Sequence, residues 1–422
     1  MKKLRKVFCI MVCMTLLAGS LSACGKEQDK PTVPVDTQTV ESTTEENKES
    51  EISVEESQTT QEPKETQTPE ATPAPEYIDR SAAKAILDKM TTGWNLGNTL
   101  DAHGAGNSLS SETYWGNPKT THEMIDAIAA QGFDSIRIPV TWAEHMGPAP
   151  DYIVDEAWMK RVEEVVNYAL DNEMHVIINT HHEPGYWLTP DPQKADKVVE
   201  RFEALWKQIA EHFKEYDERL VFEGMNEVRT IGSEKEWSGG TEEERKVVDR
   251  LNAAFVKTVR ATGGNNETRL LIISPYGNSA ENDALRYMEI PDDPCIAVAL
   301  HLYTPYHFTY TNDYMNLTKW DGSRAKDLEY ILTRANIHFM KKGIPVIITE
   351  YGCENKDNPE EVQKWLEHYL KLTEEYNLKC FWWDNNIYNT SGEKFGIFDR
   401  RNLKWYDQAL ADKIIELTKP AE

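Results

Sequence analysis

Two carboxylates stand at the ends of strongly apolar runs in this chain. Glu227 closes the segment LVFEGMNE, and Glu350 closes the segment PVIITE. An ionisable group in such a place costs free energy unless it is paired or used in chemistry. Two of them in one domain can supply the proton donor and the nucleophile that break a glycosidic bond. Retaining and inverting enzymes both use such a pair, and they differ in the distance between the two carboxyl groups.

Polar side chains beside these runs suit the same chemistry. Asn226 precedes Glu227, and its amide can hydrogen-bond a sugar hydroxyl as the transition state forms. Arg137 carries a permanent charge on a planar fork, which suits it to keep Glu350 ionised. The alternative for Arg137 is a salt bridge at the edge of the core, and the two interpretations overlap.

His301 and Tyr303 are two residues apart, so they share one face of an extended chain. On that face Tyr303 can hydrogen-bond the nucleophile, and His301 can orient the acid/base. These two residues therefore complete a group of polar side chains around the two carboxylates.

Tryptophan is abundant, with 12 residues in the chain. Trp383 follows an apolar run and offers an aromatic platform for the apolar face of a sugar ring. Trp94 is assigned to substrate binding on the same grounds. Trp115, Trp187 and Trp237 are further candidates near loops, and core or rim packing is the alternative for each of them.

The adjacent residues His181 and His182 raise the question of a metal site. Adjacent residues of a strand point to opposite faces, so we expect that these two histidines do not share one ion, and we expect no catalytic metal. His181 is predicted to hydrogen-bond a sugar or a catalytic carboxylate. His182 is assigned to substrate binding too, with a position behind the site or in the core as its alternative.

The rest of the sequence alternates strand-like and helix-like segments, which predicts a parallel sheet with right-handed crossovers. Near-continuous Val, Ile and Leu runs favour a sheet covered on both faces. We expect an α/β fold, a (β/α)₈ TIM barrel, with a doubly wound open sheet as the alternative. The predicted strands are 93–99, 135–139, 175–181, 220–223, 269–273, 296–300, 345–349 and 379–383, and the main helices are 121–131, 156–172, 195–216, 243–262, 325–342, 359–376 and 406–417.

A barrel makes a specific demand, because its functional residues gather at the C-terminal ends of the strands. Nine of the candidate residues of this chain occupy such places. They are Arg137, His181, His182, Asn226, Glu227, His301, Tyr303, Glu350 and Trp383.

The first residues of the chain have a different character from the remainder. Residues 1–23 have the basic start and short apolar stretch of an export signal, and LSAC resembles a bacterial lipobox with lipidation at Cys24. An ordinary secretory signal with an incidental cysteine is the alternative. Residues 24–76 are rich in Thr, Glu, Pro and Ser, which predicts a disordered linker. Residues 77–422 are predicted to be one catalytic domain.

The formal net charge is −25, which argues against nucleic acid and against an anionic membrane surface as partners. An acidic protein is compatible with a neutral polymer as substrate. Cys295, Cys353 and Cys380 lie in or beside apolar runs without metal-ligand spacing. We expect buried thiols there, and one disulfide among them stays open.

Taken in order, these motifs resemble the glycoside hydrolase family 5 cellulases, close to the endoglucanase and xyloglucanase branch. The resemblance covers about residues 78–420. It implies a (β/α)₈ barrel, retention by double displacement and no cofactor, with Glu227 as acid/base and Glu350 as nucleophile. The segments that carry it are GWNLGNTLD from Gly93, IRIPVTW from Ile136, FEGMNE from Phe222, HLYTPY from His301 and WWDN from Trp382.

The sequence therefore predicts a retaining endo-β-1,4-glucanase that cuts internal bonds of plant cell-wall glucans. We expect an exported, extracellular monomer, held by a lipid anchor at the outer face of the cell membrane. A xyloglucanase, lichenase, xylanase or mannanase of the same family is the alternative. Different classes are a non-catalytic polysaccharide-binding lipoprotein and a metal-dependent amidohydrolase.

Overall fold

The computed structural model describes residues 78–310 and 315–419. The predicted export signal 1–23, the candidate lipidation site Cys24 and the predicted linker 24–76 lie outside the described residues. Within the described ranges, every helix is too short or too polar to traverse a lipid bilayer.

Eight parallel strands close into a barrel, in which each strand pairs with its neighbours in the chain and β8 pairs with β1. The predicted barrel is thus confirmed, and the open sheet is excluded. The strands are β1 (Gly93–Leu96), β2 (Ser135–Ile138), β3 (His175–Asn179), β4 (Leu220–Glu223), β5 (Leu271–Ile273), β6 (Ile296–His301), β7 (Val346–Tyr351) and β8 (Cys380–Asp384).

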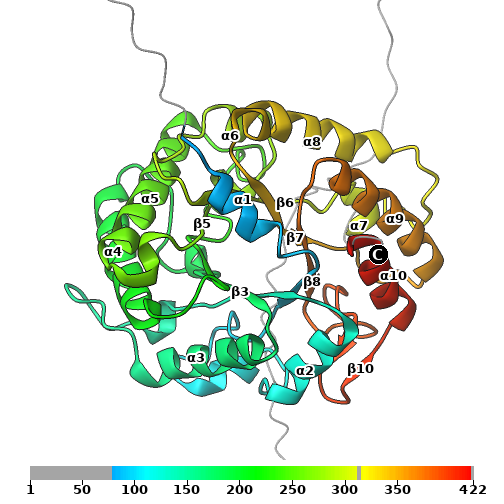
Figure 1. Cartoon of the computed structure of the whole chain (residues 1–422), viewed down its shortest axis with the longest axis horizontal. Helices are drawn as coiled ribbons and strands as arrows, with labels where there is room; N and C mark the ends of the chain where they lie inside the picture. The colour runs from blue at the N-terminus through cyan, green and yellow to red at the C-terminus, as the bar shows by residue number, and fades with distance from the viewer. Residues whose placement is uncertain (1–77, 311–314, 420–422) are drawn as a thin grey trace, which may run out of the picture. The chain divides into compact units, whose positions relative to one another are not determined.

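Helices surround the barrel and cover the outer face of its sheet (Figure 1). On α4 an apolar stripe is buried, from Val198 through Phe202 and Leu205 to Phe213. The helices are α1 (Ser81–Leu87), α2 (His122–Gln131), α3 (Glu156–Asp171), α4 (Ala195–Phe213), α5 (Glu242–Ala261), α6 (Asn282–Arg286), α7 (Tyr306–Thr309), α8 (Ala325–His338), α9 (Pro359–Glu375) and α10 (Gln408–Thr418).

The inside of the barrel has its own small apolar core, separate from the large core between strands and helices. Helix α1, which the sequence patterns did not predict, lies across one end of the barrel (Figure 1). Its Ala83 and Leu87 pack with inward residues such as Ile177 and Phe381. Apolar residues therefore fill that end, and polar inward residues are left for the C-terminal ends of the strands.

Several element ends differ from the predictions. Strand β3 ends at Asn179, two residues earlier than expected, and α8 ends at His338 before a short 3₁₀ turn over Met340–Lys342. A short hairpin of β9 (Phe398–Asp399) and β10 (Lys404–Trp405) follows the barrel. The early end of β3 changes the directions of the residues that follow it.

The assignment of Trp94 to substrate binding is wrong. Asn95 points into the barrel, so its neighbour Trp94 points outward, where it is 1% exposed within the large core. The guanidinium of Arg400 lies 5.1 Å from the centre of its ring. Trp94 is therefore a packing residue, and a sugar cannot reach it.

Cys295, Cys353 and Cys380 are buried free thiols. Burial raises the pKa of Cys295 to about 11 and that of Cys380 to about 12. The prediction of buried structural thiols is confirmed, and the disulfide left open from the sequence does not form among these three residues.

Candidate active site

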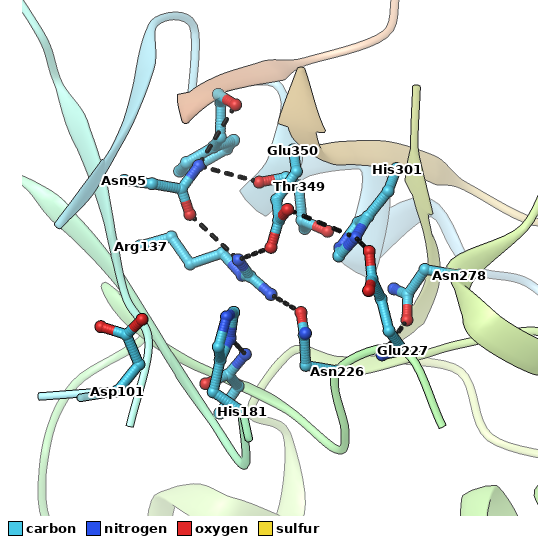
Figure 2. Close-up of polar contacts among 12 residues, drawn as sticks. Asn95, Asp101, Arg137, His181, Asn226, Glu227, Asn278, His301, Thr349 and Glu350 are labelled. Carbon is cyan, nitrogen blue, oxygen red and sulfur yellow. Dashed lines mark hydrogen bonds and ion pairs between the residues drawn. The ribbon is translucent and has the colours of Figure 1, made fainter. Parts of the chain in front are cut away.

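Arg137 is the centre of the polar group at the C-terminal mouth of the barrel (Figure 2). It lies on β2 with its side chain fully closed to solvent. Its nitrogens donate to four oxygens on different elements. These are Oε2 of Glu223 at 2.6 Å, Oε1 of Glu350 at 2.7 Å, Oδ1 of Asn226 at 2.8 Å and Oδ1 of Asn95 at 3.0 Å.

The charge of Arg137 is secure in this position. Burial alone lowers the pKa of a guanidinium, but the charges of Glu223 and Glu350 outweigh this effect, so the pKa of Arg137 is raised. One buried cation thus faces two carboxylates and two amides. Removing a partner from such a buried group is strongly unfavourable, which fixes the positions of the side chains around it.

Glu350 is held from two sides. Its Oε1 accepts from Arg137, and its Oε2 accepts from the hydroxyl of Tyr303 at 2.9 Å. Burial, with the adjacent charge of Glu350, raises the pKa of Tyr303 well above its ordinary range, so this hydroxyl keeps its proton and donates it. The carboxylate of Glu350 therefore has a fixed orientation at the floor of the site.

Glu227 follows β4 in an unusual backbone conformation. Its φ is 44°, in the left-handed region that a non-glycine residue adopts only at a cost. The side chain of Asn278 stabilises this conformation, because its Oδ1 accepts from the N–H of Glu227 at 2.8 Å. This turn directs the carboxylate of Glu227 toward His301 (Figure 2).

His301 connects the two carboxylates. Its Nδ1 lies 2.8 Å from Oε1 of Glu227 and 3.5 Å from Oε2 of Glu350. One oxygen of each carboxylate lies within 4.8 Å of the other. Retaining glycosidases hold their carboxyl groups about 5–5.5 Å apart, whereas inverting enzymes leave a wider gap for water. The separation here fits the retaining geometry.

The protonation of Glu227 reflects opposing influences. Its burial raises the pKa of this carboxyl, but the hydrogen bond from His301 and the charges of His301, Arg229 and His182 outweigh burial, so the pKa is lowered. The side chain is 20% exposed, so water still reaches it in the unliganded protein.

His181 lies beside the guanidinium of Arg137 and next to Asn226 (Figure 2). Its ring is parallel to that of Trp383, with 5.6 Å between the centroids. Burial, followed by the neighbouring charges of His182, Arg137 and His301, lowers its pKa well below the ordinary value, so the ring is neutral. Trp383 itself needs the small Gly97 beside it, because a Cβ there would lie 2.8 Å from the indole ring.

The argument that His181 and His182 point to opposite faces is wrong. The strand ends at Asn179, and the chain turns at His182 into a short 3₁₀ helix. One ligand atom of each histidine and one of Asp101 consequently lie within 4.8 Å of one another. The Nε2 of His182 is 3.5 Å from Oδ2 of Asp101, whose carboxylate also accepts from backbone N–H groups of the loop after β1.

Residues of the site that were missed from the sequence include Asn95, Asp101, Asn179, Glu223 and Asn278. The signal for Glu223 was present, because it too is a carboxylate that directly follows an apolar run, Leu220–Phe222. Asn179 donates to Oε2 of Glu223 at 2.9 Å and lies 3.2 Å from Nδ1 of His181. It thereby links the buried charge group to His181.

An aromatic group stands farther out on the same side as His182. His103 lies 4.9 Å from Trp115 and 5.2 Å from Tyr186 between ring centroids, and it lies 5.5 Å from His182. The hydroxyl of Tyr186 lies 2.8 Å from Nδ1 of His103 and 3.0 Å from Glu144. Trp115 and Tyr186 are exposed, so this group offers ring faces to a ligand.

A closed parallel barrel with paired carboxylates at its C-terminal mouth is the architecture of the (β/α)₈ glycoside hydrolases. Residues 99–389 match the cellulase family, glycosyl hydrolase family 5. The match spans more than half of the chain, and the chain belongs to this family.

Known proteins of the family are similar over most of the chain. Endoglucanase A of Ruminococcus albus is 51% identical over 342 residues, which are 80% of this chain and 93% of that protein. A xyloglucan-specific endo-β-1,4-glucanase from a metagenomic library, solved with cellotriose, is 50% identical with a TM-score of 0.79 and covers 80% of this chain and 99% of its own. A broad-specificity endoglucanase of Ruminococcus champanellensis, also with bound cellotriose, is 42% identical with a TM-score of 0.77 over 80% of this chain and 99% of its own.

Proposed function

We propose that this protein hydrolyses internal β-1,4-glucosidic bonds of plant cell-wall glucans by double displacement. It is a glycoside hydrolase, an endo-1,4-β-glucanase, in keeping with its family and with the endoglucanases that it resembles. The observation that carries the retaining mechanism is the separation of Glu227 and Glu350, whose nearest carboxylate oxygens lie within 4.8 Å.

In the first step, an oxygen of Glu350 forms a bond to the anomeric carbon as the bond from that carbon to the glycosidic oxygen breaks. Glu227 gives its proton to the departing oxygen. In the second step, Glu227 takes a proton from water, the water oxygen bonds to the anomeric carbon, and the bond to Glu350 breaks. Arg137 and Tyr303 support the first step by fixing both oxygens of Glu350.

Glu227 must be protonated for the first step, although its pKa is lowered in the unliganded protein. A glucan chain in the cleft covers the exposed part of this carboxyl and removes water from it. Loss of water disfavours the charged form of a carboxyl and raises its pKa. Substrate binding thus favours the protonated form of Glu227 that the first step requires.

The remaining site residues bind the sugar. The amide nitrogen of Asn226 is left for a hydroxyl, because its oxygen accepts from Arg137. The neutral ring of His181 is suited to a hydrogen bond with a hydroxyl, and the ring of Trp383 is suited to stacking on a pyranose. His182 lies next to the exposed ring group of Trp115 and Tyr186, where it contacts a more distant glucose unit.

The substrate is a β-1,4-linked glucan backbone, and xyloglucan is a specific candidate. The neighbour at 50% identity is xyloglucan-specific, whereas a neighbour at 42% is a broad-specificity endoglucanase. A lichenase at 33% identity shares the fold as well. We propose that the chain belongs to the endoglucanase and xyloglucanase branch of its family.

Release of reducing ends tests this function. Carboxymethyl cellulose and xyloglucan should both be cut, with a rapid fall in viscosity that marks internal cleavage. NMR of the first products should show the β-anomer before mutarotation. Initial α-anomer would contradict retention, and the absence of hydrolysis on carboxymethyl cellulose, xyloglucan, lichenan, xylan and mannan would contradict the function itself.

We further propose the organisation that the sequence predicts. Residues 1–23 direct export, Cys24 carries a lipid anchor, residues 24–76 form a linker and residues 77–422 form the catalytic domain. The enzyme then acts as a monomer outside the cell, at the outer face of the cell membrane. Labelling with a radioactive fatty acid, lost in Cys24→Ser, is the corresponding test.

A further inference from the structure

Arg229 contacts the proposed acid/base at the carboxylate oxygen that His301 does not meet. Its Nη1 lies 3.0 Å from the carbonyl oxygen of Glu227 and 3.3 Å from Oε2 of the same residue. His301 meets the other carboxylate oxygen, Oε1, at 2.8 Å. The carboxyl of Glu227 therefore sits between two nitrogen donors, and Arg229 is the outer one.

The loop after β4 holds this arginine in place. Glu236 accepts from Nε of Arg229 at 3.0 Å and from the N–H of Gly232 at 2.7 Å. The guanidinium also lies 4.2 Å from the centre of the Trp237 ring, a distance at which a cation and an aromatic face attract each other. The arginine is thus clamped between a carboxylate and an indole, and its side chain is only 19% exposed.

Trp237 itself is open to solvent. It is 55% exposed, although the guanidinium of Arg229 packs against its ring. Within the part of the chain that the structure describes, Nη2 of Arg229 makes no hydrogen bond to another residue. An exposed ring and a free donor therefore stand together next to the acid/base.

The position of this pair relative to the chemistry defines which part of a glucan it can meet. A general acid donates its proton to the leaving oxygen, so the leaving half of the chain passes the carboxyl of Glu227. Arg229 contacts that carboxyl, and Trp237 packs against the guanidinium of Arg229. The pair therefore stands where the leaving half of the glucan passes.

We propose that Trp237 and Arg229 form the binding site for the glucose unit on the leaving-group side of the cleaved bond, with Arg229 also positioning Glu227. The ring stacks on the apolar face of the sugar, and Nη2 donates to one of its hydroxyls. Arg229 keeps the carboxyl of Glu227 directed at the departing oxygen. This inference rests on the proposed function, because it assigns a role within that reaction.

β-Cellobiosyl fluoride separates this site from the chemistry. Its leaving group is a fluoride ion, which offers no sugar for Trp237 to bind and needs little protonation. Trp237→Ala should lower kcat/KM on cellopentaose by about tenfold, the equivalent of roughly 1.4 kcal/mol of lost binding, mainly through KM. On the fluoride the same variant should lose less than about twofold in kcat/KM, because that substrate has no sugar on the leaving-group side.

A matched control is available on the outer ring of helices. Tyr330 on α8 is 65% exposed, and the guanidinium of Arg334 lies 4.7 Å from the centre of its ring. Tyr330→Ala removes a similar exposed ring under an arginine, outside the mouth of the barrel. It should change neither reaction.

The positioning role of Arg229 has a separate readout. The titratable and charged groups around the carboxyl of Glu227 are His301 on β6, Tyr303 just after β6, Glu350 on β7, Arg229 on its own loop and His182 after β3. Arg229→Met removes a cation that lowers the pKa of Glu227, so this pKa should rise. The alkaline limb of the pH profile of kcat/KM should therefore move to higher pH. Arg229→Lys keeps the charge, so its alkaline limb should return to the wild-type pH. Its KM for cellopentaose should stay raised.

Three results would overturn the proposal. They are equal losses of Trp237→Ala on cellopentaose and on the fluoride, unchanged kinetics of this variant on cellopentaose, and an unmoved alkaline limb in Arg229→Met. Failure of the proposed function looks different, because the wild-type protein would then leave both substrates intact.

Discussion

Nη1 of Arg137 lies 2.7 Å from Oε1 of Glu350, in an ion pair that is almost entirely closed to solvent. The pair joins β2 to β7 across the inside of the barrel. Because Arg137 also binds Glu223 and Asn226, the position of the nucleophile is fixed by three other strand-end residues together with Tyr303. Such fixation is what an attack on one defined carbon requires.

Glu350→Gln should abolish turnover while leaving the fold intact. The amide is nearly the same size, but it is a far weaker nucleophile than a carboxylate, so kcat on carboxymethyl cellulose should fall about a thousandfold or more. Circular dichroism should be unchanged. Glu360→Gln, an exposed carboxylate at the start of α9, is the matched control. Activity of Glu350→Gln close to that of the wild type would refute the assignment of the nucleophile.

Glu227→Ala should separate substrates by their leaving groups. A glucan needs a proton on the departing oxygen, so kcat on the polymer should fall by about 10²–10⁴. A dinitrophenyl β-cellobioside has a leaving group that departs without a proton and should still form the glycosyl-enzyme.

Azide offers a second readout for the same variant. The second step of Glu227→Ala lacks its base, and azide needs none, so azide should accelerate turnover of the aryl substrate and yield a β-glycosyl azide. Equal loss on both substrates, or an α-azide product, would contradict the acid/base role of Glu227.

The sequence predicted several site residues that stand at the C-terminal ends of barrel strands. The ends of parallel strands meet at one mouth, so Arg137, Glu227, His301 and Glu350 could be grouped without any knowledge of distances. Their contacts in the structure follow the expected pairs, with Arg137 and Tyr303 on Glu350. His301 contacts Glu227 as expected.

The rest depended on where each strand ends and on which face each residue lies. Trp94 and Asn95 are neighbours, and nothing in their types says which one points inward. The side chains of His181 and His182 come together because β3 ends at Asn179, before both of them. When a strand ends two residues earlier than expected, the residues beyond its end no longer point alternately to opposite faces. Asn278 lies far from Glu227 in the chain and supports it only through the fold.

Glu183 should make the stability of the protein depend on pH. Burial raises its pKa from 4.5 to about 7, against the backbone N–H of Trp142, the indole of Trp187 and the charge of Arg201. A raised carboxyl pKa stabilises the folded state at low pH, and this contribution is lost as pH rises from about 4.5 to 7. The free energy of unfolding should fall by about 3 kcal/mol over this range on account of Glu183.

Denaturant unfolding at several pH values measures this effect. Glu183→Gln does not ionise, so its stability should vary less between pH 5 and pH 8 than that of the wild type. Its free energy of unfolding at pH 5 should be lower than that of the wild type. The amide nitrogen would replace Oε2, and it cannot accept the hydrogen bond that the indole N–H of Trp187 donates there. Glu200→Gln, on the exposed face of α4, should follow the wild-type curve, and an identical curve for Glu183→Gln would disprove the assignment.

Trp94 and Trp383 allow a direct comparison of a packing tryptophan with one at the site, because they lie on the paired strands β1 and β8. Trp94→Phe removes volume from a closed core and should lower the free energy of unfolding by about 1–3 kcal/mol, with KM for carboxymethyl cellulose unchanged. Trp383→Phe reduces the ring that faces the sugar and should raise KM by severalfold to about tenfold. Thermal unfolding and steady-state kinetics of both variants provide the test. A raised KM in Trp94→Phe, or an unchanged KM in Trp383→Phe, would show that the faces of these two residues have been assigned the wrong way round.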